Sequence, residues 1–161
     1  MNWSELSHPR HAFGEKDKEY KFGGDISRNM LDQILTPNEL DMLKIVVQLL
    51  FTSVILENSD LHCMLVGSSL TETYFDLDMI CCTDPPNHRD KVVNSMSRLS
   101  NGYFMDINLR TTNNKLLTKH KIFMHRNFVY FDISFAGIDS GTWQDVKEFH
   151  ERTQLSHCVL L

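Results

Sequence analysis

The sequence predicts an α+β fold in which helices pack on a mixed sheet of about four or five strands. Three observations lead to this prediction: a helix with a clear capping signal at residues 36–56, a pair of apolar strands after it, and a strictly alternating segment near residue 130. With 161 residues, of which 42% are hydrophobic, the chain is long enough to bury one substantial core. We therefore predict a single domain over residues 36–161, preceded by a polar arm over residues 1–35.

The first helix has the strongest local signal. Thr36-Pro37-Asn38-Glu39 combines an N-cap threonine, a proline at the first helical position and a glutamate three residues after the cap, which is a capping box. Apolar residues then recur at helical spacing, at Leu40, Leu43, Val47, Leu50 and Val54. The polar run Glu57-Asn58-Ser59-Asp60 ends the helix, so its apolar stripe is expected to face the core.

The remaining elements follow in order along the chain. Strands are predicted over residues 62–66, 75–82, 103–110 and 121–125, and further helices over residues 87–99 and 142–153. The most regular strand is predicted over residues 128–135. There Val129, Phe131, Ile133 and Phe135 share one face, and Tyr130, Asp132 and Ser134 share the other.

Charge and hydropathy exclude some functions and restrict others. The net charge of −5 gives no overall attraction for nucleic acid. Binding to RNA would need a local basic patch such as Lys115, Lys119, Lys121 and Arg126, but a solvated surface is the preferred interpretation of these residues. The longest apolar run, residues 45–56, is too short to span a bilayer, and the polar N-terminus does not resemble a secretory signal. We expect a cytoplasmic protein, with a nuclear location also open.

The four cysteines do not have metal-ligand spacings. Cys63, Cys81 and Cys82 fall in apolar strands, where a reduced thiol behaves as a small hydrophobic group. The end of the chain, Cys158-Val159-Leu160-Leu161, fits a C-a-a-X prenylation box, although the residues before it are not basic. A chance match is the preferred interpretation, and contact with a membrane is expected only if Cys158 is prenylated.

A small-residue turn and two carboxylates indicate the functional site. Gly67, Ser68 and Ser69 follow an apolar strand and offer backbone N–H groups and hydroxyls to phosphates. Asp76 and Asp78 are separated by one residue on the next strand, so their carboxylates share one face and repel each other unless a cation lies between them. A hard cation such as Mg²⁺ takes oxygen ligands together with substrate phosphates. The pattern predicts a site for Mg²⁺ and a nucleotide.

A two-metal phosphoryl-transfer site commonly needs a third acidic ligand on a neighbouring strand. Asp106 and Asp132 are the candidates. Asp132 is preferred because the alternate face of its strand is wholly apolar, which directs the carboxylate away from the core. Asp106 borders a glycine turn and has a less defined direction.

These residues resemble the DNA polymerase β-like nucleotidyltransferase superfamily. The resemblance rests on Gly67-Ser68, on Asp76-Leu77-Asp78 and on Phe131-Asp132-Ile133-Ser134-Phe135, which is similar to the strand of the third metal-binding aspartate in poly(A) and poly(U) polymerases. Within the superfamily, Tyr74-Phe75-Asp76-Leu77-Asp78-Met79-Ile80 looks nearest to the terminal nucleotidyltransferases named "family with sequence similarity 46".

The resemblance implies a palm domain that transfers AMP from ATP to an RNA 3′ end and thereby stabilises mRNA. It implies Mg²⁺ at Asp76, Asp78 and Asp132, and phosphates at Gly67, Ser68 and Ser69. The family's helical domain has no counterpart in these 161 residues, and whether a partner protein supplies that half is left open by the sequence. The alternative is a palm without activity that serves as a protein- or RNA-interaction module.

Overall fold

The structure, a computed structural model, describes residues 24–67, 70, 76–111, 120–136 and 143–161, except for the side chains of residues 110, 111 and 120. Its strands are β1 (Asp60–Val66), β2 (Asp76–Asp84), β3 (Met105–Thr111), β4 (His120–Arg126), β5 (Val129–Phe135) and β6 (His157–Val159). The α-helices are α2 (Leu31–Ile34), α3 (Pro37–Leu56), α4 (Arg89–Ser100) and α5 (Trp143–Thr153), and short 3₁₀ helices are η1 (Arg28–Met30) and η3 (Pro86–His88). The predicted α+β class is confirmed.

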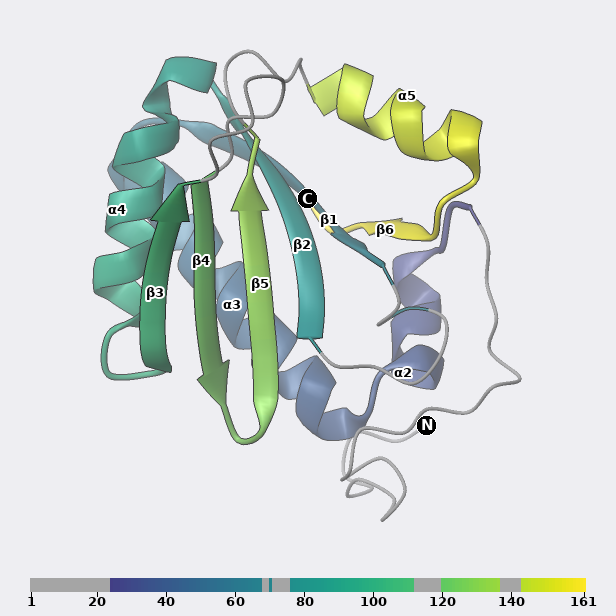
Figure 1. Ribbon diagram of the computed structural model, residues 1–161, viewed down its shortest axis with the longest axis horizontal. Helices are drawn as coiled ribbons and strands as arrows, with labels where there is room; N and C mark the ends of the chain where they lie inside the picture. Colours follow the sequence, from purple (N-terminus) through teal and green to yellow (C-terminus); the bar gives the residue numbers. More distant parts are fainter. Residues whose placement is uncertain (1–23, 68–69, 71–75, 112–119, 137–142) are drawn as a thin grey trace.

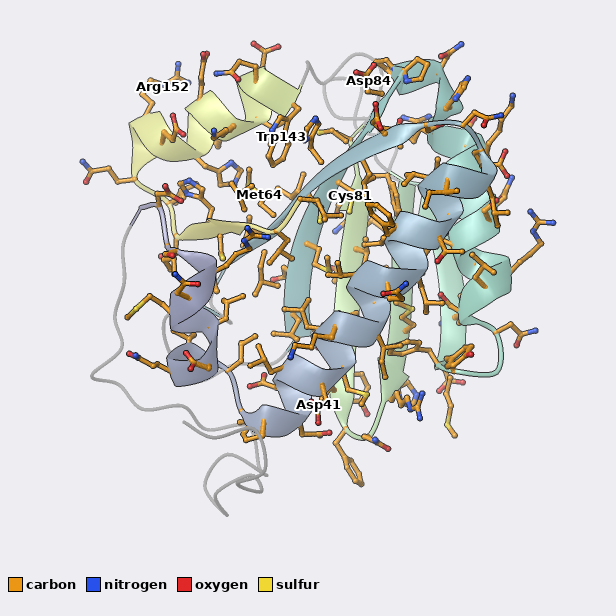
Figure 2. The ribbon with its side chains drawn as sticks, turned by 180° about the vertical axis from the view of Figure 1, so that it is seen from behind. Asp41, Met64, Cys81, Asp84, Trp143 and Arg152 are labelled. Atoms are coloured by element: carbon orange, nitrogen blue, oxygen red, sulfur yellow. The ribbon has the colours of Figure 1, made fainter. Side chains whose placement is uncertain are left out.

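The strands form one mixed six-stranded sheet in the order β3-β4-β5-β2-β1-β6. β2 and β5 run parallel, and the other neighbouring strands run antiparallel. α3 and α4 lie side by side against one face of this sheet (Figures 1 and 2). α5 lies near β1 and β6, at the end of the sheet away from β3 (Figure 1).

α3 begins as its sequence predicts. The Thr36 hydroxyl accepts a hydrogen bond from the Glu39 N–H at 3.1 Å, and the Glu39 carboxylate accepts one from the Thr36 N–H at 2.9 Å. Both residues are buried, each with about 2% of its surface exposed. This pair of bonds fixes the first turn of the helix on which much of the core packs.

The core lies between the sheet and the two long helices. β2 contributes Leu77, Met79 and Cys81, and β5 contributes Val129, Phe131 and Ile133; all are buried on the helix side. The burial of Phe131 and Ile133 next to an aspartate at position 132 follows the period-2 alternation of a strand.

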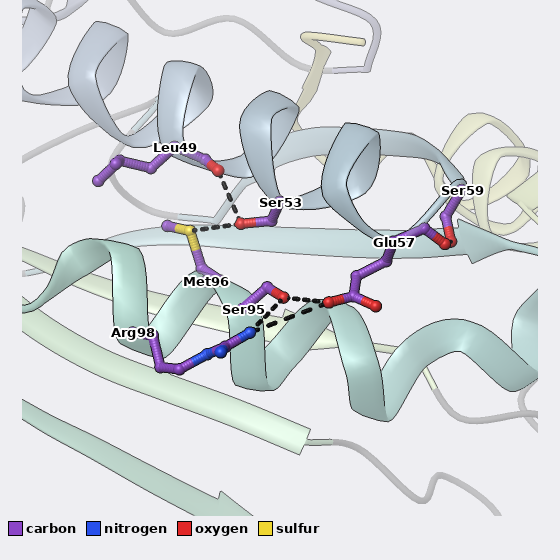
Figure 3. A network of polar contacts seen from close by, with 7 residues as sticks. All are labelled: Leu49, Ser53, Glu57, Ser59, Ser95, Met96 and Arg98. Carbon is purple, nitrogen blue, oxygen red and sulfur yellow. Dashed lines mark hydrogen bonds and ion pairs between the residues drawn. The ribbon is translucent and has the colours of Figure 1, made fainter.

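A polar network joins the ends of α3 and α4 (Figure 3). The Ser95 hydroxyl, fully buried on α4, donates a hydrogen bond to the carboxylate of Glu57, the residue that caps α3. Arg98 donates to the Ser95 hydroxyl at 3.2 Å and lies 4.0 Å from Glu57. On the α3 side, Ser53 donates to the Leu49 carbonyl at 2.7 Å. The polar atoms of this seam are thus paired within it.

Residues 24–35, which the sequence analysis assigned to the polar arm, pack on the core. Ile26, Leu31, Ile34 and Leu35 are buried there, and Asp25 forms a β-bridge with His157. β6 was not among the predicted strands. Its Cys158 is fully buried beside Leu65, and burial raises the pKa of the thiol to about 11, so in this fold it is neither accessible nor readily ionised.

No helix within the described residues combines the length and apolar character needed to cross a membrane.

Candidate functional site

The two carboxylates of β2 lie on the sheet face opposite α3 and α4. Leu77 and Met79 are buried on the helix side, whereas Asp76 and Asp78 are only partly buried on the other side. We call this other side the carboxylate face. α5 covers its β1–β6 end, where His62 of β1 stacks on Trp143 with ring centroids 5.3 Å apart.

The parallel pairing of β2 and β5 brings the predicted third carboxylate to the same face. In the register of these strands Asp78 is opposite Asp132, and Asp76 is opposite Tyr130. Neighbouring strands are about 4.8 Å apart, so the side chains of Asp78 and Asp132 stand side by side. The sheet therefore brings Asp76, Asp78 and Asp132 together from two strands that are far apart in the sequence.

These carboxylates are in an unfavourable electrostatic environment. Burial, together with the charges of Asp132 and Asp76, raises the pKa of Asp78 from its ordinary value of 3.8 to about 6. Burial and the charge of Asp132 also raise the pKa of Asp76. Desolvation and like charge both disfavour ionisation, and a bound cation would relieve both effects.

One cation already lies on this face. The ammonium of Lys121 on β4 is 3.5 Å from Oδ2 of Asp132, and both side chains are largely buried, with exposures of 27% and 18%. Its charge lowers the pKa of Asp78 and thus opposes the other influences on that group. The second oxygen of Asp132, Oδ1, is buried and has no hydrogen-bond partner among the described residues. A buried carboxylate oxygen in this state retains an unused acceptor site.

The glycine at the end of β1 approaches Asp78 closely. Gly67 has a φ of +84°, in the region that favours glycine, and a Cβ built on it would lie 3.0 Å from Oδ2 of Asp78. Glycine at this position leaves free space beside the carboxylate. The predicted phosphate-binding residues Ser68 and Ser69 lie outside the described residues.

The alternative third carboxylate, Asp106, is not part of this group. It lies on β3, and β4 separates β3 from the strand of Asp132. Its side chain is 78% exposed, and its Oδ2 is 2.7 Å from Nε2 of His125. Asp106 therefore orients a histidine and does not contribute to the carboxylate cluster.

The donor atoms of the cluster suit Mg²⁺ in kind, because all of them are carboxylate oxygens. Within the described part of the chain, however, no three acidic, histidine or cysteine side chains are arranged as a ready ligand set. The ion pair of Lys121 with Asp132 is consistent with that finding. A cation here would need to take over the Asp132 oxygen that Lys121 now faces.

Sequence reasoning missed the role of Lys121, which it had considered only as part of a basic patch. It also missed the rings beside the carboxylates, His125 and Tyr130. The short turn at Asn127 and Phe128 was the available signal, because a tight hairpin fixes which residues of β4 and β5 lie opposite each other. Phe123 is opposite Asp132 in this register, which puts Lys121, two residues along β4, within diagonal reach of the carboxylate.

A scan of protein-family models found no match to this chain, and a search of curated proteins found no significant match.

Proposed function

We propose that this chain is a nucleotidyltransferase-type palm that transfers AMP from ATP to the 3′ end of an RNA. The observation that carries the proposal is the side-by-side placement of Asp78 and Asp132 on the parallel β2–β5 pair, with Gly67 against Asp78. The motif resemblance around these residues gives the reaction class. Reactions at RNA 3′ ends also fit a cytoplasmic or nuclear location, where mRNA is found.

In this proposal Asp76, Asp78 and Asp132 hold Mg²⁺, and the turn that begins at Gly67 receives the triphosphate. Held there, a cation would supply charge compensation at the transferring phosphoryl group and would lower the pKa of the attacking hydroxyl. The protein positions the carboxylates on two rigid, hydrogen-bonded strands. It also keeps an uncommitted acceptor, Oδ1 of Asp132, within the cluster.

Lys121 has two uses in such a site. While no cation is bound, its ammonium offsets the charge of Asp132 across 3.5 Å. Once released from Asp132, the same ammonium is free to pair with a phosphate oxygen, since Lys carries three donors on a flexible stem.

The experiment is AMP incorporation from radiolabelled ATP into an oligo(A) primer by the wild-type chain and by Asp78→Asn, with Mg-ATP binding measured in parallel. We expect the wild type to extend the primer and Asp78→Asn to lose at least about a hundredfold in rate, because it removes one negative ligand of the cation. Phe51→Ala, on the helix side of the sheet, should behave as wild type. Absence of Mg-ATP binding by the wild type would contradict the proposal.

A second function is favoured by one specific observation, the Lys121–Asp132 ion pair in a cluster without a ready ligand set. It is a palm without catalytic activity that binds RNA or a partner protein. Mg-ATP binding without any incorporation into the primer would support this second function over the first.

A further inference from the structure

Beside the carboxylates, β4 and β5 present aromatic rings on the same face. His125 lies opposite Tyr130 in the β4–β5 register, and their rings stack with centroids 4.9 Å apart and planes inclined by 26°. Phe123 occupies the next position of that face on β4, opposite Asp132. We call Phe123, His125 and Tyr130 the ring cluster. Tyr130 is 46% exposed, which is unusual for a large ring on a central strand.

The ring pair is held in place by its neighbours. His125 Nε2 lies 2.7 Å from the Asp106 carboxylate, whose residue adopts a φ of +52° at an irregularity in the β3–β4 pairing. The hydrogen bonds of β5 with both neighbouring strands fix the backbone of Tyr130, and the stack on His125 restricts its ring. A ring that is already fixed loses little conformational entropy when a flat ligand stacks on it.

The rings are directly beside the proposed reaction site. Tyr130 is opposite Asp76 on β2 and lies two residues, about 6.6 Å along the strand, from Asp132. A ligand stacked on Tyr130 would therefore have its next atoms over the carboxylates.

The charge of this part of the chain differs from that of the whole. Residues 107–131 contain no Asp or Glu, and they carry Arg110, Lys115, Lys119, Lys121 and Arg126, in a chain of net charge −5. Lys121 on β4 lies 5.9 Å from the centroid of the Phe123 ring. A ring beside a cation, as at Phe123 and Lys121, suits single-stranded nucleic acid, because bases stack on rings and phosphates pair with cations.

We propose that the ring cluster binds the terminal bases of a single-stranded RNA, with a base stacked on Tyr130 and the 3′ end directed toward Asp132. The direction of the RNA in this inference rests on the proposed function, whereas the binding of RNA bases to the ring cluster does not depend on it. The base of ATP has the same chemistry, but the basic segment 107–131 offers charge for a chain of phosphates, so we assign the ring cluster to RNA.

The test is the affinity of a 5′-fluorescein-labelled oligo(A), measured by fluorescence anisotropy without ATP. Tyr130→Ala should weaken binding by about tenfold or more, because stacking contributes roughly 1–3 kcal/mol per base. Tyr130→Phe retains the ring and should bind like the wild type. Phe51→Ala removes a ring of similar exposure, 50%, from α3 on the other side of the sheet and should also bind like the wild type.

Two further arms identify the ligand. The same RNA annealed to oligo(U) offers no unpaired bases, so Tyr130→Ala should change its binding by less than about twofold. Mg-ATP should bind to Tyr130→Ala with the same affinity as to the wild type. An equal loss of affinity for ATP and for RNA would show that the rings bind the base of the nucleotide. Retention of wild-type oligo(A) affinity by Tyr130→Ala would overturn the proposal, as would failure of the wild type to bind oligo(A).

The results of these experiments distinguish the transferase proposal from the ring-cluster proposal. RNA binding that depends on Tyr130, without AMP incorporation, supports the ring cluster and contradicts the transferase. AMP incorporation that Asp78→Asn abolishes, with RNA binding indifferent to Tyr130, supports the transferase and contradicts the ring cluster. Thermal unfolding of each variant identifies any change caused by loss of the fold.

Discussion

At the scale of the residue, Asp78 shows a conflict between cation binding and stability: a cation site needs its carboxylate ionised, whereas the fold is more stable when it is protonated. Its pKa is raised to about 6, mainly by burial and then by Asp132 and Asp76. A carboxylate that binds its proton more tightly in the folded state than in the unfolded chain stabilises the fold only while it is protonated. The contribution of Asp78 is therefore fully favourable below about pH 4, falls as the pH rises, and is lost above about pH 6.

We predict that Asp78→Asn stabilises the chain at pH 8 and much less at pH 4.5. The side chain is only half buried, so after allowance for solvent screening the gain at pH 8 is about 1–2 kcal/mol, or roughly 2–6 °C in Tm. Thermal unfolding followed by circular dichroism at the two pH values measures it. Asp41→Asn, an exposed carboxylate on α3, is the control and should give no such pH-dependent gain. A gain at pH 4.5 equal to that at pH 8 would contradict the assignment of the raised pKa to Asp78.

Lys121 gives a second prediction at this scale, which concerns metal affinity. Its ammonium competes with any cation for Asp132, and a unit charge about 4 Å away contributes roughly 1–4 kcal/mol at the dielectric of a protein surface. Lys121→Met should therefore tighten Mn²⁺ binding at least about fivefold, measured by the electron paramagnetic resonance of free Mn²⁺ without ATP. Lys91→Met, which removes an exposed charge from α4, should leave the affinity unchanged. Weaker Mn²⁺ binding in Lys121→Met would show that Lys121 supports the cation site instead of competing with it.

At the scale of the element, α3 depends on its capping box. Because Thr36 and Glu39 are both buried, an unpaired N–H at this end of the helix would find no water to bond. Thr36→Ala should cost about 1–2 kcal/mol in the free energy of unfolding, measured by urea denaturation. Thr36→Ser retains the hydroxyl and should recover most of that loss. An equal loss for Thr36→Ser would assign the effect to the methyl group of the threonine and not to the cap.

The elements that the sequence predicts correctly are those with local signals. The capping box specifies the start of α3 within the residues that form it, and the alternation of β5 needs no knowledge of its neighbours. β6 has no such signal, because its three residues become a strand only through their pairing with β1. Residues 24–35 were likewise misjudged as an arm, since their short helices are held by packing and by the bridge of Asp25 with His157.

The same distinction applies to the candidate site. Period-2 alternation alone placed Asp76 with Asp78 on one face and directed Asp132 away from the core. That Asp132 is the neighbour of Asp78, and that Asp106 is two strands removed from Asp132, depends on strand order, which one sequence does not specify. The ion pair of Lys121 depends in addition on the register between β4 and β5.

At the scale of the whole molecule, the sheet separates two surfaces with different tasks. The helix side buries the core under α3 and α4, as Figures 1 and 2 show from opposite directions. The carboxylate face has no described helix over β2, β5 and β4, and the ring of Tyr130 is exposed there. The net charge of −5 repels a polyanion from the molecule as a whole, whereas residues 107–131 carry five Lys or Arg residues and no Asp or Glu.

This charge distribution predicts how RNA binding responds to salt. Each phosphate neutralised on a single strand contributes about −0.7 to the slope of log K against log salt concentration. If between two and all five cations of residues 107–131 pair with phosphates, the slope lies between about −1.4 and −3.5. Anisotropy titrations of oligo(A) over a range of KCl concentrations give the value. Lys121→Gln should make the slope shallower by about 0.7, because Lys121 lies 5.9 Å from the centroid of the Phe123 ring, whereas Arg152→Gln, on α5, should leave it unchanged. A slope near zero would mean that stacking alone holds the RNA, and equal effects of the two variants would mean that the net charge of the molecule, and not the cation beside the rings, determines the attraction.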